Sequence, residues 1–483
     1  MGGYHCLFHF LFIYSLLQVH VIHSLNQTCN TTDLEALLAF SSGLESSRLV
    51  GWGPNDVACC SWTGISCDLG RVVGLDLSNK SLHGGISPAI TLLDGLVTLN
   101  LSCNSLRGQP PEGLGRLARL RKLDLSVNML FGVFPVSEGG YLAIEVVNVS
   151  FNKFTGSHPV FPSAMNLTVL DISSNAFSGG FNTMALCIAP VKALRFSRNG
   201  FNGEILAGFG RCRMLAELSI DGSGLTGNLP SDLYTLSELR RLSLLENQLS
   251  GGLSKYLGNF SQLIHIDLSY NMVTGVIPDV FGGLRRLELF NLASNSFSGT
   301  LPASLSSCSM LRVINLRNNS LSGEIAVHFN LLPRLKVLDA GSNMLSGAIP
   351  PSLMWCTKLK TLNFERNKLE GEIPESFKNL RSLSHLSLVH NGFTNLSLAL
   401  RVLQHLPKLT SLVLTKNLRG VETLPMDGIS GFKSMQVLVL AHCAVCALRH
   451  DSTLAAELGE PQNIGPFMEQ VEPNDAAPVG QSE

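Results

Sequence analysis

A repeated motif constrains this chain more than any other feature of its sequence. The pattern L-x-x-L-x-L-x-x-N-x-L begins near Val72 and recurs to Met435, mostly at intervals of 24 residues, and gives sixteen repeats. Asn fills the ladder position of the motif at Asn104, Asn128, Asn152, Asn175, Asn199, Asn247, Asn271, Asn295, Asn319, Asn343, Asn367, Asn391 and Asn417. Lys80, Ser223 and Cys443 hold the same phase without being Asn. A fixed period of this length predicts one stacked array, not a set of separate globular domains.

Each position of the motif has a physical reason. The Leu-x-Leu alternation predicts a short strand with every second side chain buried. Stacking these strands in parallel would bury a continuous leucine column. The Asn lies where the strand turns away, and its amide can both donate to and accept from the backbone groups that the turn leaves unpaired. We therefore expect a hydrogen-bonded ladder of Asn side chains along the array.

The second half of the repeat is rich in Gly and Pro. Gly follows the ladder position by four residues, as at Gly275, and Pro often follows three residues later, as at Pro278. Gly permits turn conformations that a side chain would forbid, and Pro fixes an extended segment. This L-x-G-x-I-P half-repeat resembles the plant-specific subclass of leucine-rich repeats. The resemblance implies an α/β solenoid, a right-handed superhelix with a parallel β-sheet on its concave face.

The two ends of the chain depart from the repeat. Residues 1–24 contain a mostly apolar run and predict a signal peptide. Residues 25–70 are similar to the N-terminal cap of plant leucine-rich repeat proteins, with an acidic, leucine-rich helix followed by C-C-S-W-T-G-I-S-C. Residues 71–446 hold the repeats, the last incomplete, and residues 447–483 are predicted to be a disordered acidic tail. The cap resemblance implies Cys29–Cys59 and Cys60–Cys67 disulfides, although the spacing alone leaves three pairings open.

Charge and acceptor motifs bear on location. The formal net charge of −1 gives no electrostatic case for nucleic acid as a partner. No apolar run after the signal segment is long enough to span a bilayer. Glycosylation acceptors Asn-X-Ser/Thr occur at Asn26, Asn30, Asn79, Asn100, Asn148, Asn166, Asn259, Asn318 and Asn395. Together with the signal segment and the cysteine-rich cap, they predict the secretory pathway and an extracellular or plasma-membrane location.

Three stretches resemble the phytosulfokine receptors, which are plant receptor kinases for a tyrosine-sulfated pentapeptide: L-N-F-E-R-N-K-L-E-G-E-I-P-E-S-F-K-N-L at 362–380, L-P-K-L-T-S-L-V-L-T-K-N at 406–417 and G-F-K-S-M-Q-V-L-V-L-A at 431–441. The resemblance implies a secreted sulfated peptide hormone and a leucine-rich repeat co-receptor kinase as partners. The chain contains no kinase motif, and the family's island domain and membrane helix do not follow the repeats. We therefore expect a receptor ectodomain cut short within a longer protein. In this form it would be no enzyme, would be unable to signal and would bind the hormone weakly.

A polar column on the concave face is the candidate ligand surface. The residue between the two strand leucines is mostly Asn, Asp or Ser, and it should face outward. Glycans at Asn100 and Asn148 would cover the first repeats, which favours residues 265–415. The candidate ligand-binding residues are Asn291, Asn315, Arg317, Asp339, Asn363, Glu365, Ser387 and Thr415. Arg317 is predicted to meet the sulfate, because guanidinium groups hold such anions with fixed donors. The simpler alternative is a solvated sheet face without a ligand.

Other motifs give weaker indications of function. Asp339 and Glu365 could imitate an acid–base pair, but the pattern implies an open face without a pocket. Cys187 and Cys212 share nearly the same phase in adjacent repeats, which suits a disulfide, whereas Cys308 and Cys356 lie two repeats apart and are expected to be buried thiols. The C-x-x-C at 443–446 has no second ligand pair, so no metal and no cofactor is predicted.

Two other functions remain open at this level. Short secreted plant leucine-rich repeat proteins resemble the polygalacturonase inhibitors, which block a pathogen cell-wall enzyme with their concave face. A soluble chain that bound the hormone could instead act as a decoy receptor.

Overall fold

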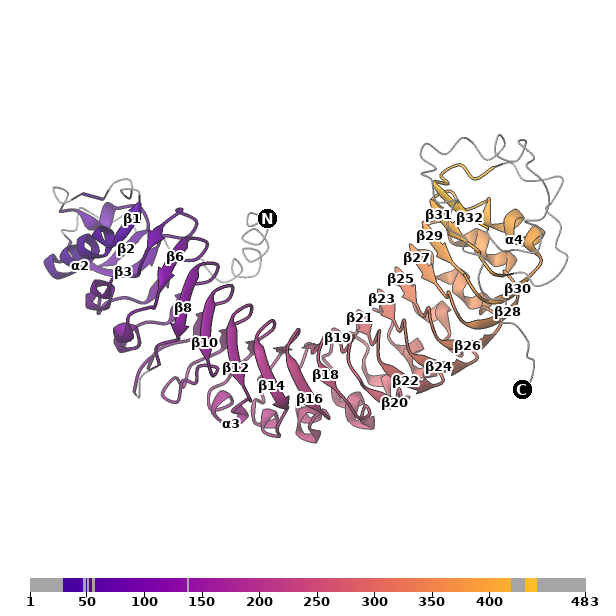
Figure 1. Ribbon diagram of the computed structural model, residues 1–483, viewed down its shortest axis with the longest axis horizontal. Coiled ribbons are helices and arrows are strands. Elements are labelled where there is room, and N and C mark those ends of the chain that lie inside the picture. The colour runs from indigo at the N-terminus through magenta and orange to yellow at the C-terminus, as the bar shows by residue number, and fades with distance from the viewer. Residues whose placement is uncertain are drawn as a thin grey trace, which may run out of the picture.

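The computed structural model describes residues 29–46, 49, 52–53, 57–136, 139–417 and 431–440. Within them the chain forms an open arc of stacked coils, with the long parallel sheet along the inner side and helical turns along the outer side (Figure 1). The predicted leucine-rich repeat solenoid is confirmed. The signal segment 1–24, the acceptor Asn26, the cysteines at 443 and 446, and the predicted tail 447–483 lie outside the described residues.

Sixteen strands form the parallel part of the concave sheet within the described ranges, one for each repeat of the motif. They are β3 (Arg71–Asp76), β5 (Thr98–Asn100), β7 (Lys122–Asp124), β9 (Val146–Asn148), β11 (Val169–Asp171), β13 (Ala193–Arg195), β15 (Glu217–Ser219), β17 (Arg241–Ser243), β19 (His265–Asp267), β21 (Leu289–Asn291), β23 (Val313–Asn315), β25 (Val337–Asp339), β27 (Thr361–Asn363), β29 (His385–Ser387), β31 (Ser411–Val413) and β32 (Val437–Val439). Each pairs in parallel with the next, and β2 (Ile65–Asp68) adds one antiparallel strand before β3. The sheet is therefore open and runs the length of the array.

A second row of short strands follows the Asn position. Nine strands form its first sheet: β1 (Leu44–Ser46), β4 (His83–Gly84), β6 (Ser105–Gly108), β8 (Met129–Val133), β10 (Lys153–Gly156), β12 (Ala176–Gly179), β14 (Gly200–Glu204), β16 (Gly224–Gly227) and β18 (Gln248–Leu249). Six form its second: β20 (Thr274–Val276), β22 (Ser296–Gly299), β24 (Ser320–Gly323), β26 (Met344–Gly347), β28 (Lys368–Glu372) and β30 (Gly392–Thr394). A single bridge between Gly252 and Thr274 joins the two.

Short helices cover the outer side. The α-helices are α2 (Thr31–Ser42), α3 (Thr183–Leu186) and α4 (Leu396–Leu403). The 3₁₀ turns are η2 (Cys59–Ser61), η3 (Pro88–Leu92), η4 (Glu112–Arg116), η5 (Phe209–Arg211), η6 (Ser231–Thr235), η7 (Lys255–Asn259), η8 (Phe281–Gly283), η9 (Ala303–Ser307), η10 (Phe329–Leu331), η11 (Pro351–Trp355) and η12 (Glu375–Asn379). No helix of the described residues is long and apolar enough to cross a membrane.

The predicted Asn ladder is present, and Asn343 illustrates it. Its Nδ2 donates to the carbonyls of Leu316 (2.9 Å), Ala340 (3.1 Å) and Gly341 (3.2 Å), while its Oδ1 accepts from the Leu321 amide at 3.0 Å. One buried side chain thus links its own turn to the preceding repeat. Repeated along the stack, these bonds satisfy backbone groups that the turn would otherwise leave buried and unpaired.

The N-terminal cap is fixed by a buried carboxylate and two disulfides. Asn30 begins α2 by accepting from the amides of Thr32 and Asp33. The fully buried Asp33 accepts from the Val72 amide at 2.8 Å and from the Arg71 guanidinium at 3.0 Å, which joins the helix to the first repeat. Disulfides join Cys29 to Cys59 and Cys60 to Cys67, the pairs that the cap resemblance implies.

Candidate functional site

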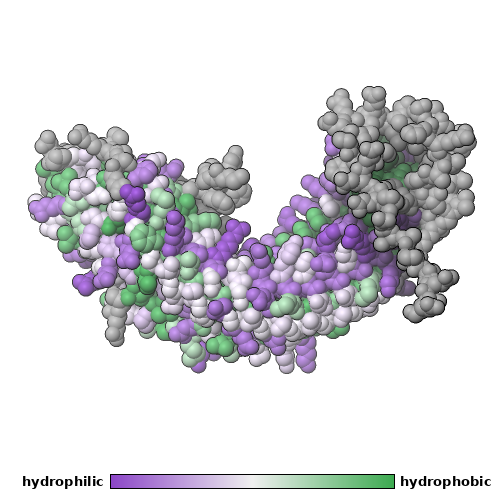
Figure 2. All heavy atoms as spheres, in the orientation of Figure 1, coloured by the Kyte–Doolittle hydropathy of each residue, from purple (hydrophilic) through white to green (hydrophobic). Residues whose placement is uncertain are grey.

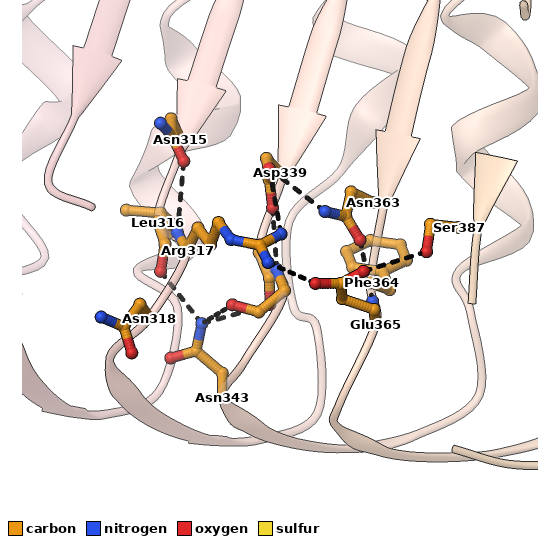
Figure 3. Close-up of polar contacts among 12 residues, drawn as sticks. Asn315, Leu316, Arg317, Asn318, Asp339, Asn343, Asn363, Phe364, Glu365 and Ser387 are labelled. Carbon is orange, nitrogen blue, oxygen red and sulfur yellow. Dashed lines mark hydrogen bonds and ion pairs between the residues drawn. The ribbon is translucent and has the colours of Figure 1, made fainter. Parts of the chain in front are cut away.

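Strand register places the predicted column residues side by side. Asn291, Asn315, Asp339, Asn363 and Ser387 are consecutive partners at the ends of β21, β23, β25, β27 and β29. Figure 3 shows the last four pointing from neighbouring strands toward one polar surface. We call Asn291, Asn315, Asp339, Asn363 and Ser387 the polar column.

The polar column has a structural role as well as an exposed face. Asn315, Asp339 and Asn363 each accept, through one side-chain oxygen, from the backbone amide two residues later, at 3.3, 3.0 and 3.0 Å. The Nδ2 of Asn363 also donates to Asp339 at 3.2 Å, and that of Asn291 donates to Asp267 at 2.9 Å. These bonds account for the short polar residue at this position, as the simpler alternative requires, and they hold the remaining polar atoms in fixed directions.

Arg317 is the centre of an ion-pair cluster. Its Nη2 donates to Glu365, two repeats away, in a close ion pair, and its Nη1 lies 3.8 Å from Asp339 (Figure 3). Glu365 also accepts from the Ser387 hydroxyl at 3.2 Å. Burial raises the pKa of the Asp339 carboxyl, although the Gly341 amide and Arg317 oppose the shift. Arg317 is therefore already neutralised by two carboxylates, and the cluster carries one net negative charge.

Gly341 makes room for this cluster. A Cβ at Gly341 would lie 3.0 Å from Glu365 Cγ and 3.2 Å from Arg317 Nη1. Both distances are shorter than ordinary contacts, so the absence of a side chain at 341 lets Arg317 and Glu365 meet across the intervening repeat. Periodicity alone does not single out Gly341, because the residue at this position varies among the other repeats: about half of them carry Ser, and the rest carry Ala, Thr, Leu, Val or a charged residue.

Thr415 lies apart from the cluster. Its carbonyl accepts from the His390 amide at 2.9 Å, and its place is two repeats beyond Glu365 in the stack. The structure thus brings Arg317, Asp339, Asn363, Glu365 and Ser387 into one network, with Asn291 and Thr415 flanking it.

Three basic residues beside this network are not among the predicted site residues. Arg366, His390 and Lys416 follow the concave strands in consecutive repeats, and all three are exposed. Each adopts a left-handed backbone, with φ of 52°, 55° and 56°. Ion pairs are absent from all three among the described residues. The turn position just before the ladder Asn could have identified them, because every residue there lies at the same rim of the concave face.

The glycosylation acceptors fall into two groups. Asn79, Asn166, Asn259 and Asn318 are exposed, and Asn318 stands at the same rim as Arg366, one residue after Arg317. Asn30, Asn100, Asn148 and Asn395 are only partly exposed, and their side chains accept bonds from neighbouring groups. Asn148 and Asn395 also donate through the Nδ2 atom that a glycan would occupy, to Asp124 and Glu372. Asn259 and Asn318 of the first group donate through Nδ2 as well, to the Tyr234 carbonyl at 3.4 Å and the Ser294 hydroxyl at 3.3 Å. Exposure alone therefore separates the two groups, and the exposed Asn318 lies inside the candidate ligand region 265–415.

Metal-ligating atoms gather at one place among the described residues. The sulfurs of Cys29, Cys59 and Cys60 lie close together, but each is used in a disulfide. Asp339 and Glu365, which could have formed an acid–base pair, are both bound to Arg317. The arrangement is suited to binding an extended ligand on an open surface.

Fold, ladder and cap define a plant-type leucine-rich repeat solenoid. The family models agree: the leucine rich repeat N-terminal domain matches residues 30–68, and leucine rich repeats match residues 237–297, 95–117, 310–332 and 358–380.

The known proteins that this chain resembles include plant receptors. The chain is 39% identical over 233 residues to phytosulfokine receptor 1 of Arabidopsis thaliana, which covers 42% of this chain but only 18% of that protein. Among solved structures, the plant peptide hormone receptor RGFR1 in complex with RGF2 has a TM-score of 0.66 and 27% identity, covering 79% of this chain and 72% of that one. A TDR receptor has a TM-score of 0.64 and 26% identity, covering 76% of each chain. The chain therefore resembles the ectodomains of plant leucine-rich repeat receptors.

Proposed function

We propose that this chain is an extracellular ligand-recognition domain and that it binds a short tyrosine-sulfated peptide on the concave face between residues 265 and 415. The observation that carries the proposal is the polar column, held in register on neighbouring strands and continuous with the Arg317 cluster. The similarity to phytosulfokine receptor 1 supports a sulfated peptide as the ligand class. By the same resemblance, the partner would be a leucine-rich repeat co-receptor kinase at the plasma membrane.

The peptide backbone would lie along the polar column. Asn and Ser side chains offer both donors and acceptors, which suits the amide groups of an extended chain. Arg317, Asp339 and Glu365 would form a fixed group beneath the peptide. Gly341 has no side chain that would rise between them.

The sulfate of the ligand needs a cation without an attached carboxylate. Removing Glu365 from Arg317 to admit a sulfate would leave a half-buried carboxylate unpaired, which is costly. Arg366 lies one residue after Glu365 and is exposed without an ion pair among the described residues. We therefore assign the sulfate contact to Arg366, with His390 and Lys416 beside it, and give Arg317 the role of a positioning residue.

The test compares three single variants in titrations with a tyrosine-sulfated peptide and its unsulfated counterpart. Arg366→Ala should weaken binding of the sulfated peptide by about tenfold and leave the unsulfated peptide unaffected, since a charge-assisted contact contributes roughly 1.5 kcal/mol or more. Arg317→Ala should weaken both peptides alike. Arg401→Ala, an exposed cation on α4, is the matched control.

Two results would decide against the proposal. Equal affinity for the sulfated and the unsulfated peptide would show that the chain does not recognise the sulfate. A loss confined to the sulfated peptide in Arg317→Ala, with Arg366→Ala unchanged, would return the sulfate contact to Arg317.

A further inference from the structure

A strip of cations runs along the edge where the concave strands begin. We call this edge, in the six segments 283–289, 307–313, 331–337, 355–361, 379–385 and 404–411, the C-terminal leading edge. Its backbones stack directly, because Lys336 donates to the Arg312 carbonyl at 2.8 Å, Lys360 to the Lys336 carbonyl at 2.8 Å, and Ser384 to the Lys360 carbonyl at 2.9 Å. Arg312, Lys336 and Lys360 are therefore neighbours in three successive repeats.

The charge of this strip is almost entirely of one sign. The six segments hold a single acidic residue, Glu288, which pairs with Arg312 at 3.0 Å. They hold nine cations: Arg285, Arg286, Arg312, Arg334, Lys336, Lys358, Lys360, Arg381 and Lys408. All but Arg312 and Lys336 are exposed, and those two are half-buried. The strip therefore carries about eight net positive charges in a chain whose formal net charge is −1.

The same edge differs in the earlier repeats. The corresponding eight segments hold nine cations but also Asp94, Glu145, Glu217 and Glu238. These segments are 92–98, 116–122, 140–146, 163–169, 187–193, 211–217, 235–241 and 259–265. Two of these acids form ion pairs with leading-edge cations, Arg121–Glu145 at 3.4 Å and Arg241–Glu217 at 3.9 Å. The glycosylation acceptors Asn166 and Asn259 also lie there, whereas the C-terminal leading edge has none. The cationic strip thus contains one acid, Glu288, and no glycosylation acceptor.

The shape of the strip limits what it can bind. Parallel strands lie about 4.8 Å apart, so six repeats place a row of cations along roughly 24 Å. Figure 2 shows hydrophilic residues gathered in a band across the C-terminal half of the molecule, with hydrophobic residues more interspersed in the N-terminal half. A one-dimensional periodic row of cations matches a linear polymer with an anionic group on each unit. An acidic face of a folded protein would have no reason to repeat at the strand spacing.

We propose that the C-terminal leading edge binds a linear acidic polysaccharide, one that carries a carboxylate or a sulfate on successive sugars. Lysine and arginine side chains would contact the anionic groups, and release of counterions from the polymer would favour association. The surface is distinct from the polar column, so polysaccharide and peptide could be bound together. This proposal does not depend on the identity of the peptide.

The test uses the purified glycosylated chain and an oligogalacturonate long enough to span the strip. The same oligomer with every carboxylate methyl-esterified is the ligand control, and a dextran sulfate of similar length, which has sulfates and no carboxylate, distinguishes sulfate from carboxylate as the anion. We expect binding to the free acid and not to the ester. Raising NaCl from about 50 mM to about 200 mM should weaken it tenfold or more.

A pair of matched triple variants locates the site. Lys336→Gln, Lys358→Gln and Lys360→Gln together should weaken binding by about a hundredfold, since a cation near an anionic surface contributes on the order of a factor of five to the affinity. Arg119→Gln, Arg121→Gln and Lys122→Gln together remove the same charge from the earlier leading edge and should cost less than threefold. Circular dichroism of each variant checks folding.

Three outcomes would overturn the proposal. Equal loss in both triple variants would mean attraction by overall charge. Equal binding of the free acid and the ester would exclude recognition of the anionic groups. Binding of polyglutamate as tight as that of the oligogalacturonate would point to an acidic protein segment as the partner.

Discussion

The two halves of the solenoid join their repeats differently. From Asn247 to Asn417 every ladder position is Asn, and each side chain bonds to the repeat before it. In the N-terminal half the ladder is interrupted at Ser223, whose hydroxyl reaches only the carbonyl of Asp221, at 3.5 Å within its own turn. Ser is one bond too short to reach the preceding repeat, so this junction lacks the links that Asn supplies elsewhere.

Two other features connect the interrupted junction. The Cys187–Cys212 disulfide, which the shared phase of these cysteines predicts, joins the second halves of the repeats of Asn175 and Asn199, and so fixes the repeat that Ser223 fails to reach. On the concave side, Asp221 binds the Ser197 hydroxyl at 3.0 Å and accepts from Ser243 at 2.6 Å, spanning three repeats. A regular stack thus holds itself by a repeated hydrogen bond, and a local defect in it is offset by a covalent bond and a bridging carboxylate.

The first prediction concerns the disulfide in the N-terminal half. Replacing Cys187 and Cys212 by Ala should lower the free energy of unfolding by about 3.5 kcal/mol, the entropic contribution expected for a loop of 25 residues. Urea denaturation of the double variant measures it. If the stability is unchanged, the disulfide does not support the interrupted junction.

The second prediction concerns the Asn ladder in the C-terminal half. Asn343→Ala removes four hydrogen bonds from a buried site, and we expect a loss of about 2 to 3 kcal/mol because backbone groups are left unsatisfied. Asn330→Ala, at an exposed position in η10, is the control and should change stability by less than about 0.5 kcal/mol. A similar effect in both variants would contradict the role of the ladder.

The third prediction repairs the defect. Ser223→Asn should restore the ladder and raise the free energy of unfolding by about 1 kcal/mol. The same substitution should recover more stability in the chain that lacks Cys187 and Cys212, because the two links share the repeat of Asn199. A double-mutant cycle gives the coupling, and strict additivity would show that the two links are independent.

The fourth prediction concerns acid. His158 occupies the position of Ile in the G-x-I-P segment, is buried against Phe181 and Phe201, and accepts from the Asn182 amide at 2.9 Å. Burial lowers the pKa of its imidazole, although the carbonyl of Pro159 opposes the shift. The folded chain therefore holds His158 neutral, while the unfolded chain protonates it below about pH 6.5.

Stability should accordingly fall as the pH drops below about 6.5, by at most about 1.3 kcal/mol between pH 7 and pH 5.5. Urea denaturation at pH 7 and pH 5.5 checks this. His158→Ile should show a smaller loss over the same interval, and an equal loss in both chains would assign the pH dependence to other groups.

Periodicity was enough to predict the sheet, the ladder and the outward-facing polar column, because each depends on residue type at a fixed phase. It could not predict the Arg317–Glu365 contact, which crosses two repeats and depends on the missing side chain of Gly341. Nor could it show that Arg317 is neutralised and Arg366 is not, since both are arginines close to the same column. Contacts between repeats that are not adjacent depend on side-chain length and on the space around each side chain. The repeated motif does not encode either property.

The most direct test of the account asks where a peptide touches the solenoid. A tyrosine-sulfated peptide with a photoreactive group would be cross-linked to the purified chain at saturating concentration, and the attachment sites mapped by mass spectrometry. We expect attachment within residues 265–415, at or beside the polar column and Arg366, and competition by unlabelled peptide. Competed attachment confined to the repeats before residue 265 or to the outer helical side would contradict it.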